Sequence, residues 1–315
     1  QAVGNLEVSG ARTHVLSLRL FDGPDMPSLT CLYICSFERK KQGDTAMNGS
    51  EDLGGAAPGR WITAAIALLE YVQETQLEAI GSAAEICADS IGSGGLVHLF
   101  GTGHSRIPVE EMFPRYGSYP GFNPIVELSM TFHTQITGAN GQRQAMFIER
   151  VEGLAEQILV NFDFGSNDAM IIYSSSGSTA VPIEMAIGAH DRGLPVVAVT
   201  SVAHSSATAS GHSSGTRLMD HADIVIDLGT PPGDSLIEID GPETRVGPGS
   251  TVSNVAITNE IKVQTASLLA ARGLLPPVLT SAVVVGAERS SELFNAAYGE
   301  HSRRLANVLA KAETP

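Results

Sequence analysis

The feature that most constrains the fold is a regular alternation of short apolar runs with amphipathic stretches. The apolar runs stand at residues 95–100, 122–128, 168–173, 195–200 and 222–228. Stretches with helical spacing of apolar residues lie between or after them, chiefly at 144–159, 180–193, 250–273 and 291–309. Such alternation is typical of parallel strands covered by helices on both faces. We therefore predict an α/β fold, a three-layer αβα sandwich with a mostly parallel sheet.

The composition limits the classes of partner. Asp and Glu number 34 against 19 Lys and Arg, so the net charge is −15, which argues against nucleic acid because phosphate backbones attract clustered cations. No apolar run approaches the ~20 residues that span a bilayer, so no membrane partner is expected. Cys31, Cys35 and Cys87 show no ligand-like spacing, which fits a reducing cytoplasm. We expect a cytoplasmic protein without a built-in metal.

The chain divides into a short first segment and one large domain. Residues 1–46 lack clear periodicity, whereas a helical pattern begins at Trp61 and leads into the alternating region. We expect residues 47–315 to form a single domain, with N-terminal helices within 61–91 and helices at its C-terminal end. Residues 1–46 are expected to be a disordered or dispensable upstream extension. The alternative is an ordered β-arm that is exchanged between subunits.

Two loops that follow predicted strands share one design. The glycine loop, GTGHSR at 101–106, places Ser105 three residues before Pro108, and the serine loop, SSSGST at 174–179, places Thr179 three residues before Pro182. A hydroxyl residue and then a proline are typical of a helix start. Because both loops follow parallel strands, two helix N-termini would converge at one edge and form an anion site. The alternative is that these hydroxyl groups only cap the helices.

The same stretches resemble the sugar isomerase (SIS) phosphosugar-binding domain. SSSGST matches the S-x-S-G-x-T signature of that family, and GTGHS at 101–105 matches its first loop. The resemblance covers about residues 60–300, extends to a subgroup of stand-alone bacterial proteins, and implies the SIS fold with flavodoxin-like topology. By that resemblance the phosphate would be held by Ser105, Ser174, Ser175, Ser176, Gly177 and Thr179, with backbone groups contributed by Ser175 and Gly177.

A dinucleotide site is the competing interpretation of the glycine loop. Gly101 and Gly103 follow one predicted strand and Glu127 ends the next, as in part of the dinucleotide fingerprint. The third glycine of that fingerprint would fall where Arg106 stands, and this side chain would crowd a pyrophosphate. We therefore expect no nicotinamide cofactor.

SIS-type enzymes remove a proton from the carbon next to a sugar carbonyl, so the resemblance implies a catalytic base. The base needs hydrogen-bond reach and a pKa near neutrality. Glu110 and Glu111, which follow the glycine loop, are the first candidates, with Glu111 favoured. His212 and His104 come next because imidazole suits proton transfer near neutral pH, and His204 ranks lower. The alternatives are a solvated acidic helix face and ordinary exposed histidines.

Other polar residues are expected near the sugar, with exposure to water as the alternative. Asp234 and Glu238 lie in a turn and a short strand after the last apolar run, and Ser250 and Thr251 begin the long helix. Lys262 lies too far along that helix to reach a sugar ring. The predicted sugar-binding residues are Gly103, Asp234, Glu238, Ser250 and Thr251.

These features predict a phosphosugar enzyme that acts on a hexosamine or N-acetylhexosamine 6-phosphate. Elimination of water, by a lyase or dehydratase, is favoured over aldose–ketose isomerisation, because no lysine is expected near the sugar. A non-catalytic phosphosugar-sensing module is the alternative from another class. SIS proteins pair so that two subunits complete each site, and the apolar stretch at 61–91 fits a homodimer or homotetramer with sites near subunit interfaces.

Deletion of residues 1–46 should leave solubility and sugar-phosphate turnover unchanged, because this segment lacks the periodicity of the domain. The full and shortened chains are compared for soluble yield and for turnover of one sugar phosphate. An insoluble or inactive shortened chain would contradict the expected boundary.

Overall fold

The computed structural model describes residues 6–8, 11–13, 58–131, 136–241 and 243–309. The chain forms two units, residues 1–52 and 53–315. In the first unit, strand β1 (Leu6–Val8) pairs antiparallel with β2 (Ala11–Thr13). The rest of residues 1–46 lies outside the described residues, so the dispensability of this segment stays a prediction.

The second unit is built on a five-stranded sheet with the order β4-β3-β5-β6-β7. Every pairing in it is parallel. All residues of the three inner strands are buried, which explains why these strands are continuous apolar runs in the sequence. The strands are β3 (Val97–Gly101), β4 (Phe122–Pro124), β5 (Ala169–Tyr173), β6 (Val196–Thr200) and β7 (Ile224–Asp227).

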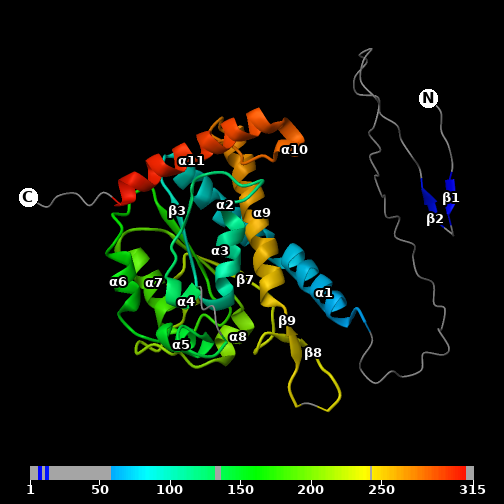
Figure 1. Ribbon diagram of the computed structural model, residues 1–315. Helices are drawn as coiled ribbons and strands as arrows, with labels where there is room; N and C mark the ends of the chain where they lie inside the picture. Colours follow the sequence, from blue (N-terminus) through cyan, green and yellow to red (C-terminus); the bar gives the residue numbers. More distant parts are fainter. Residues whose placement is uncertain (1–5, 9–10, 14–57, 132–135, 242, 310–315) are drawn as a thin grey trace, which may run out of the picture. The chain divides into compact units, whose positions relative to one another are not determined.

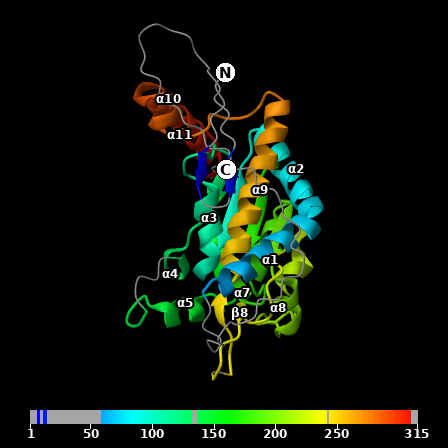
Figure 2. The same ribbon diagram turned by 90° about the vertical axis from the view of Figure 1, so that its right-hand side faces the viewer.

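Helices cover both faces of this sheet and complete three layers (Figures 1 and 2). In β5, Ile171 and Tyr173 pack into the core cluster that contains α2 (Leu77–Gly92), α3 (Ile107–Met112) and α9 (Ser250–Ala271). The alternate residues Met170 and Ile172 pack into the cluster that contains α6 (Leu154–Leu159) and α7 (Ala180–Asp191). The predicted αβα sandwich is thereby confirmed.

The remaining elements lie around this sandwich. Helices α10 (Ala282–Val285) and α11 (Ala287–Leu309) lie at the end where the strands begin, and α5 (Gln142–Ile148) and α8 (Val202–Ala207) lie at the end where the strands finish (Figure 1). The others are helices α1 (Arg60–Thr75) and α4 (Leu128–Thr131), the 3-10 helices η1 (Gly103–Arg106) and η2 (Leu218–His221), and the antiparallel strands β8 (Ser235–Ile237) and β9 (Val246–Pro248).

Two helical stretches differ from their predicted course. The stretch at 144–159 forms two helices instead of one, because Gly153 has a φ of 86°, in the left-handed region that favours glycine, and serves as the N-cap of α6. The first helical stretch is interrupted at Gln76, between α1 and α2. Gly81 and Ser82 lie inside α2 and do not interrupt it.

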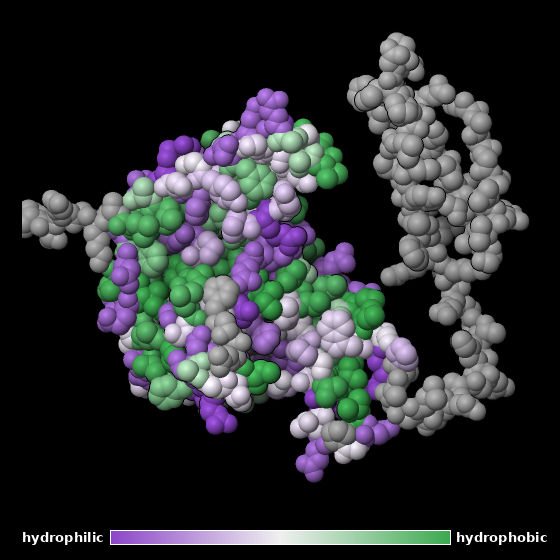
Figure 3. Space-filling model, in the orientation of Figure 1, coloured by the Kyte–Doolittle hydropathy of each residue, from purple (hydrophilic) through white to green (hydrophobic). Residues whose placement is uncertain are grey.

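Among the residues that the structure describes, no helix combines the length and the apolar character needed to cross a membrane. Hydrophobic and hydrophilic residues are interspersed over the face seen in Figure 3. The large hydrophobic side chains that α1 exposes are Trp61, Ile62, Ile66, Leu69 and Tyr71.

A buried hydrogen-bond network around Asp168 connects residues at or near the starts of β3, β4 and β5. The carboxylate of Asp168, which is 4% exposed, accepts the N–H of Leu96 at 2.8 Å and the N–H of Gly165 at 2.9 Å. It also lies 3.1 Å from His98 Nε2, and His98 Nδ1 lies 3.0 Å from the Asn123 amide nitrogen. Burial acts to raise the pKa of Asp168, but hydrogen bonds from His98 and Leu96 hold that pKa below its ordinary value.

The Asp168→Asn substitution should lower the free energy of unfolding by about 2 kcal/mol, because the amide nitrogen cannot accept the N–H of Gly165 in place of the buried carboxylate oxygen. Since the folded-state pKa of Asp168 is depressed, its contribution is present above the unfolded pKa and is lost as pH falls through the folded value. In urea unfolding, the difference in free energy of unfolding between wild type and Asp168→Asn should therefore be constant from pH 7 to 5 and shrink below about pH 4.

The exposed carboxylate of Asp163 provides the matched control, and Asp163→Asn should change the free energy of unfolding by less than about 0.5 kcal/mol. Equal effects of the two substitutions would contradict a special role for the Asp168 hydrogen bonds.

Candidate functional site

A cavity of about 570 Å³ lies where the strands of the sheet end. Its volume is in the usual range for small-molecule sites. The glycine loop, the serine loop, α5 and the start of α9 contribute most of its lining. The cavity residues that the sequence singled out are Gly103, His104, Ser105, Ser174, Ser175, Ser176, Thr179, His204, Asp234, Ser250 and Thr251.

The glycine loop is shaped by a close backbone approach. A Cβ atom on Gly101 would lie 2.2 Å from the carbonyl oxygen of Ser105, so only glycine fits at this position. Ser105 lies inside η1, and the N-cap of α3 is Arg106. The expectation that Ser105 caps the helix is therefore wrong, because a 3-10 turn precedes α3. The Ser105 residue still lines the cavity.

The serine loop turns sharply at Gly177, whose φ is 58°. A Cβ atom there would lie 2.9 Å from Thr200 Oγ1. The Gly177 N–H donates to Ser174 Oγ at 3.1 Å, and Gly177 is not among the residues that line the cavity. This backbone group, which the family resemblance assigned to phosphate, is therefore directed into the loop itself.

The start of α7 is open toward the cavity. Thr179 is the N-cap of α7, as predicted, and its side chain makes no capping hydrogen bond. Pro182, in the first turn, has no N–H to satisfy. The Thr179 residue lines the cavity. The N-terminus of this 12-residue helix thus offers partial positive charge to an anion in the cavity.

Backbone hydrogen bonds hold the serine loop in place from two sides. Ser201 N–H donates to the carbonyl of Ser175 at 3.0 Å, Leu218 N–H to that of Gly177 at 2.8 Å, and Gly211 N–H to that of Ser178 at 2.7 Å. Because the loop is already ordered, a ligand binds there without the cost of ordering it.

Glu149 is a cavity residue that the sequence reasoning missed. Its carboxylate accepts a hydrogen bond from Thr102 Oγ1 at 2.9 Å, and its backbone carbonyl accepts the Val181 N–H at 3.1 Å. Ala145, one helical turn earlier, is buried and also lines the cavity. The only sequence signal for this position was its place in the helical stretch at 144–159.

Burial raises the pKa of Glu149, and this effect outweighs the hydrogen bond from Thr102, which acts to lower it. A carboxyl group with a raised pKa in a cavity is a candidate for proton transfer. Glu149 therefore has both the location and the chemistry that the sequence reasoning sought in Glu110 and Glu111.

Glu110 and Glu111 line a different hollow, together with Tyr116 and Phe294. The Glu111 carboxylate accepts a hydrogen bond from Asn259 Nδ2 at 2.9 Å and forms an ion pair with Arg115. Although burial acts to raise the pKa of Glu111, these hydrogen bonds hold it below its ordinary value. Neither glutamate lines the cavity, so the structure does not support them as its base.

Two histidines line the cavity, His104 and His204. His204 Nδ1 is buried and has no hydrogen-bond partner among the residues that the structure describes. The sequence ranked His204 below His212, whereas the structure places His204 in the cavity and leaves His212 outside it.

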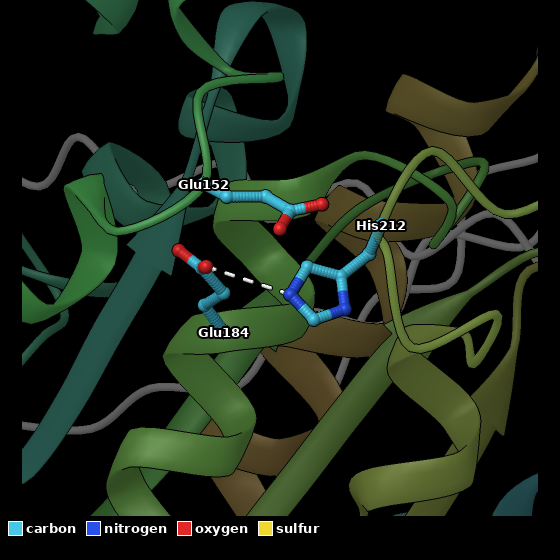
Figure 4. Close-up of side chains that lie close together, drawn as sticks. All are labelled: Glu152, Glu184 and His212. Carbon is cyan, nitrogen blue, oxygen red and sulfur yellow. Dashed lines mark ion pairs between the residues drawn. The ribbon is translucent and has the colours of Figure 1, made fainter.

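His212 lies next to Glu184, with His212 Nε2 3.5 Å from Glu184 Oε1, and Glu152 lies close to both (Figure 4). These three residues are called the Glu/His cluster below. His212 does not line the cavity. The loop that carries it nevertheless contacts the serine loop through Gly211 and Leu218.

The start of α9 is already occupied by a carboxylate. Asp234 Oδ1 accepts the N–H groups of Gly249 at 3.1 Å and Ser250 at 2.8 Å, and Asp234 Oδ2 accepts from Ser250 Oγ at 2.5 Å. Asp234 and Ser250 line the cavity, as predicted for sugar contacts, but their polar groups hold each other. Glu238 is exposed, forms an ion pair with Arg245 and does not line the cavity.

The sequence of the chain is similar to those of known proteins. The SIS domain model matches residues 60–201. A UPF0309 protein from Streptomyces coelicolor is 35% identical over 242 residues, which cover 77% of this chain and 95% of that protein. A UPF0309 protein from Thermoanaerobacter pseudethanolicus is 37% identical over 235 residues, covering 70% of this chain and 93% of that protein. A phosphoheptose isomerase structure from Neisseria gonorrhoeae aligns with a TM-score of 0.40 and 15% identity, covering 66% of this chain and 95% of that one.

The Glu149→Gln substitution should stabilise the fold increasingly as pH rises. Because the folded-state pKa of Glu149 is raised, its stabilising contribution is present below the unfolded pKa of about 4.3 and is lost as pH rises through the folded value. Glutamine retains a carbonyl oxygen to accept from Thr102 Oγ1 but does not ionise.

Urea unfolding of wild type and Glu149→Gln at pH 4, 6 and 8 checks this, with Glu110→Gln as a matched substitution outside the cavity. A free-energy difference for Glu149→Gln that did not grow with pH would contradict a raised pKa.

Proposed function

The chain belongs to the SIS domain family, and from that premise we propose that its cavity binds a sugar phosphate and that Glu149 removes a proton from the sugar. The observation that carries the proposal is the position of Glu149. Its backbone carbonyl accepts a hydrogen bond from Val181 in the first turn of α7, and its carboxylate accepts one from Thr102, the residue after β3. The acid therefore belongs to the same cavity as the serine loop.

The phosphate is assigned to the serine loop and the N-terminus of α7. No residue of the described cavity lining is a lysine or an arginine, so hydroxyl groups and the positive end of the α7 dipole would hold the anion. The proposed phosphate ligands are the hydroxyl groups of Ser105, Ser175, Ser176 and Thr179, together with the Ser174 hydroxyl, which accepts from Gly177 N–H and still has its own proton to donate.

For the reaction, we propose abstraction of the C2 proton of a hexosamine or N-acetylhexosamine 6-phosphate by Glu149. The resulting 2-amino enolate can expel the C3 oxygen as water. Alternatively it takes up a proton at C1 to give a C2 imine, which water converts to the ketose with release of the nitrogen group. We favour elimination, because no lysine lines the described cavity and His204, whose Nδ1 is buried without a described partner, can supply the proton that the leaving oxygen needs. Isomerisation is the second candidate.

We also propose a homodimer or homotetramer. Support comes from α1, on which Ile62 is 60% exposed and Ile66 51% exposed, because contiguous exposed apolar side chains mark interaction surfaces. A cytoplasmic location is proposed on the ground that cysteines are sparse and that Cys87 is free and buried.

Turnover of N-acetylglucosamine 6-phosphate tests the proposal. The Glu149→Gln substitution should lower kcat by about 10²- to 10⁴-fold, the usual contribution of a general base, and should change the Kd for the sugar phosphate only a few-fold. Glu110→Gln should retain activity. An unsaturated product that absorbs in the ultraviolet indicates elimination, and a ketose phosphate formed with release of acetamide indicates isomerisation.

Equal activity of Glu149→Gln and wild type would remove Glu149 as the base. Binding of sugar phosphates without turnover of any of them would favour the sensing module. Binding that persisted unchanged in both Ser176→Ala and Thr179→Ala would contradict the assignment of the phosphate to the serine loop.

A further inference from the structure

The Glu/His cluster brings together side chains from three separate segments (Figure 4). Glu152 lies in the turn between α5 and α6, Glu184 lies on α7, and His212 lies in the loop after α8. One ligand atom from each lies within 4.8 Å of the others. None of the three lines the proposed sugar-phosphate cavity, so the cluster is a separate feature of the surface.

We propose that the Glu/His cluster binds a divalent transition-metal ion such as Zn²⁺. Two carboxylate oxygens and one imidazole nitrogen are ligand types that Zn²⁺ accepts, at about 2.0–2.2 Å. Three protein ligands leave a coordination position for water. The imidazole selects against Mg²⁺, which prefers oxygen ligands and retains its waters.

The charge balance of the cluster favours a cation. Glu184 and His212 are partly buried, with 18% and 11% of their side chains exposed. Their mutual contact of 3.5 Å is longer than the roughly 2.7–2.9 Å of a good charge-assisted hydrogen bond. Among the described residues, Glu184 forms no other ion pair and Glu152 forms none. A metal ion would compensate both carboxylates.

Neighbouring groups already orient each of the three ligands. Ser213 donates to Glu152 from its N–H at 2.6 Å and from its Oγ at 2.8 Å. The Gly153 N–H donates to both oxygens of Glu184 at 2.8 Å. Metal ligands are commonly held by such outer hydrogen bonds, and a carboxylate has about four lone-pair sites, so coordination remains open.

The histidine is held in the same way. His212 Nδ1 lies 2.7 Å from Ser214 Oγ and accepts the Ser214 N–H at 3.2 Å, so the ring proton lies on Nε2, which faces Glu184. Metal binding at Nε2 would move this proton to Nδ1, where Ser214 Oγ can accept it. Another surface pair, His190 with Asp223 at 3.0 Å, has one carboxylate, and no third ligand group lies close to both among the residues that the structure describes. This pair offers an internal comparison.

Calorimetric titration of the metal-stripped full chain with Zn²⁺ tests the proposal. We expect one equivalent to bind in the micromolar range or tighter. Glu184→Gln and His212→Asn should each weaken this binding by at least about tenfold, and the exposed Glu152→Gln should do so without risk to the fold. His190→Asn, the matched control, should bind as wild type does. Far-UV circular dichroism verifies that each variant is folded.

Substitution by Co²⁺ gives a second readout, because the visible absorption of Co²⁺ reports nitrogen coordination and should be altered in His212→Asn. Binding that survives unchanged in Glu184→Gln and His212→Asn would place the ion elsewhere, for example on the thiols of Cys31 and Cys35, and would overturn the proposal. Millimolar binding only, as for an adventitious ion, would overturn it as well. Both results are independent of whether the cavity binds a sugar phosphate.

Discussion

The candidate site depends on the parallel pairing of β3 with β5, in which Gly101 stands beside Tyr173. Each is the last residue of its strand. The glycine loop and the serine loop therefore start from the same edge of the sheet, and parallel strands in such sheets present their carboxyl ends to ligands. A shift of this register would separate the two loops, so the pairing of buried strands fixes the location of the cavity before any polar side chain contributes.

The bend between α5 and α6 serves both proposed sites. It ends α5 just before Glu149, so that the carbonyl of this residue meets the Val181 N–H while its carboxylate meets Thr102. It also brings the N–H of Gly153 to Glu184. A straight helix through 144–159 could not make these contacts together. The left-handed conformation of Gly153 is thus needed for the placement of the proposed base and of the Glu/His cluster.

Patterns that depend on local periodicity predicted the fold well, and residue roles that depend on distant contacts were predicted poorly. Continuous apolar runs such as 168–173 identified buried strands, and the loops after them identified most of the cavity. Glu149 was missed because its partners, Thr102 and Val181, are distant in the sequence. Glu111 was overrated because Asn259, which holds its carboxylate, stands on a helix much later in the chain.

The carboxylate of Asp234 at the start of α9 has a consequence for the choice of ligand. It holds the N–H groups of Gly249 and Ser250 and offsets the positive end of a 22-residue helix. In the part of the cavity lined by Asp234 and Ser250, an anion would therefore meet negative charge. For the proposed ligand this means discrimination by charge, because a second anionic group in that part of the cavity would be repelled by Asp234.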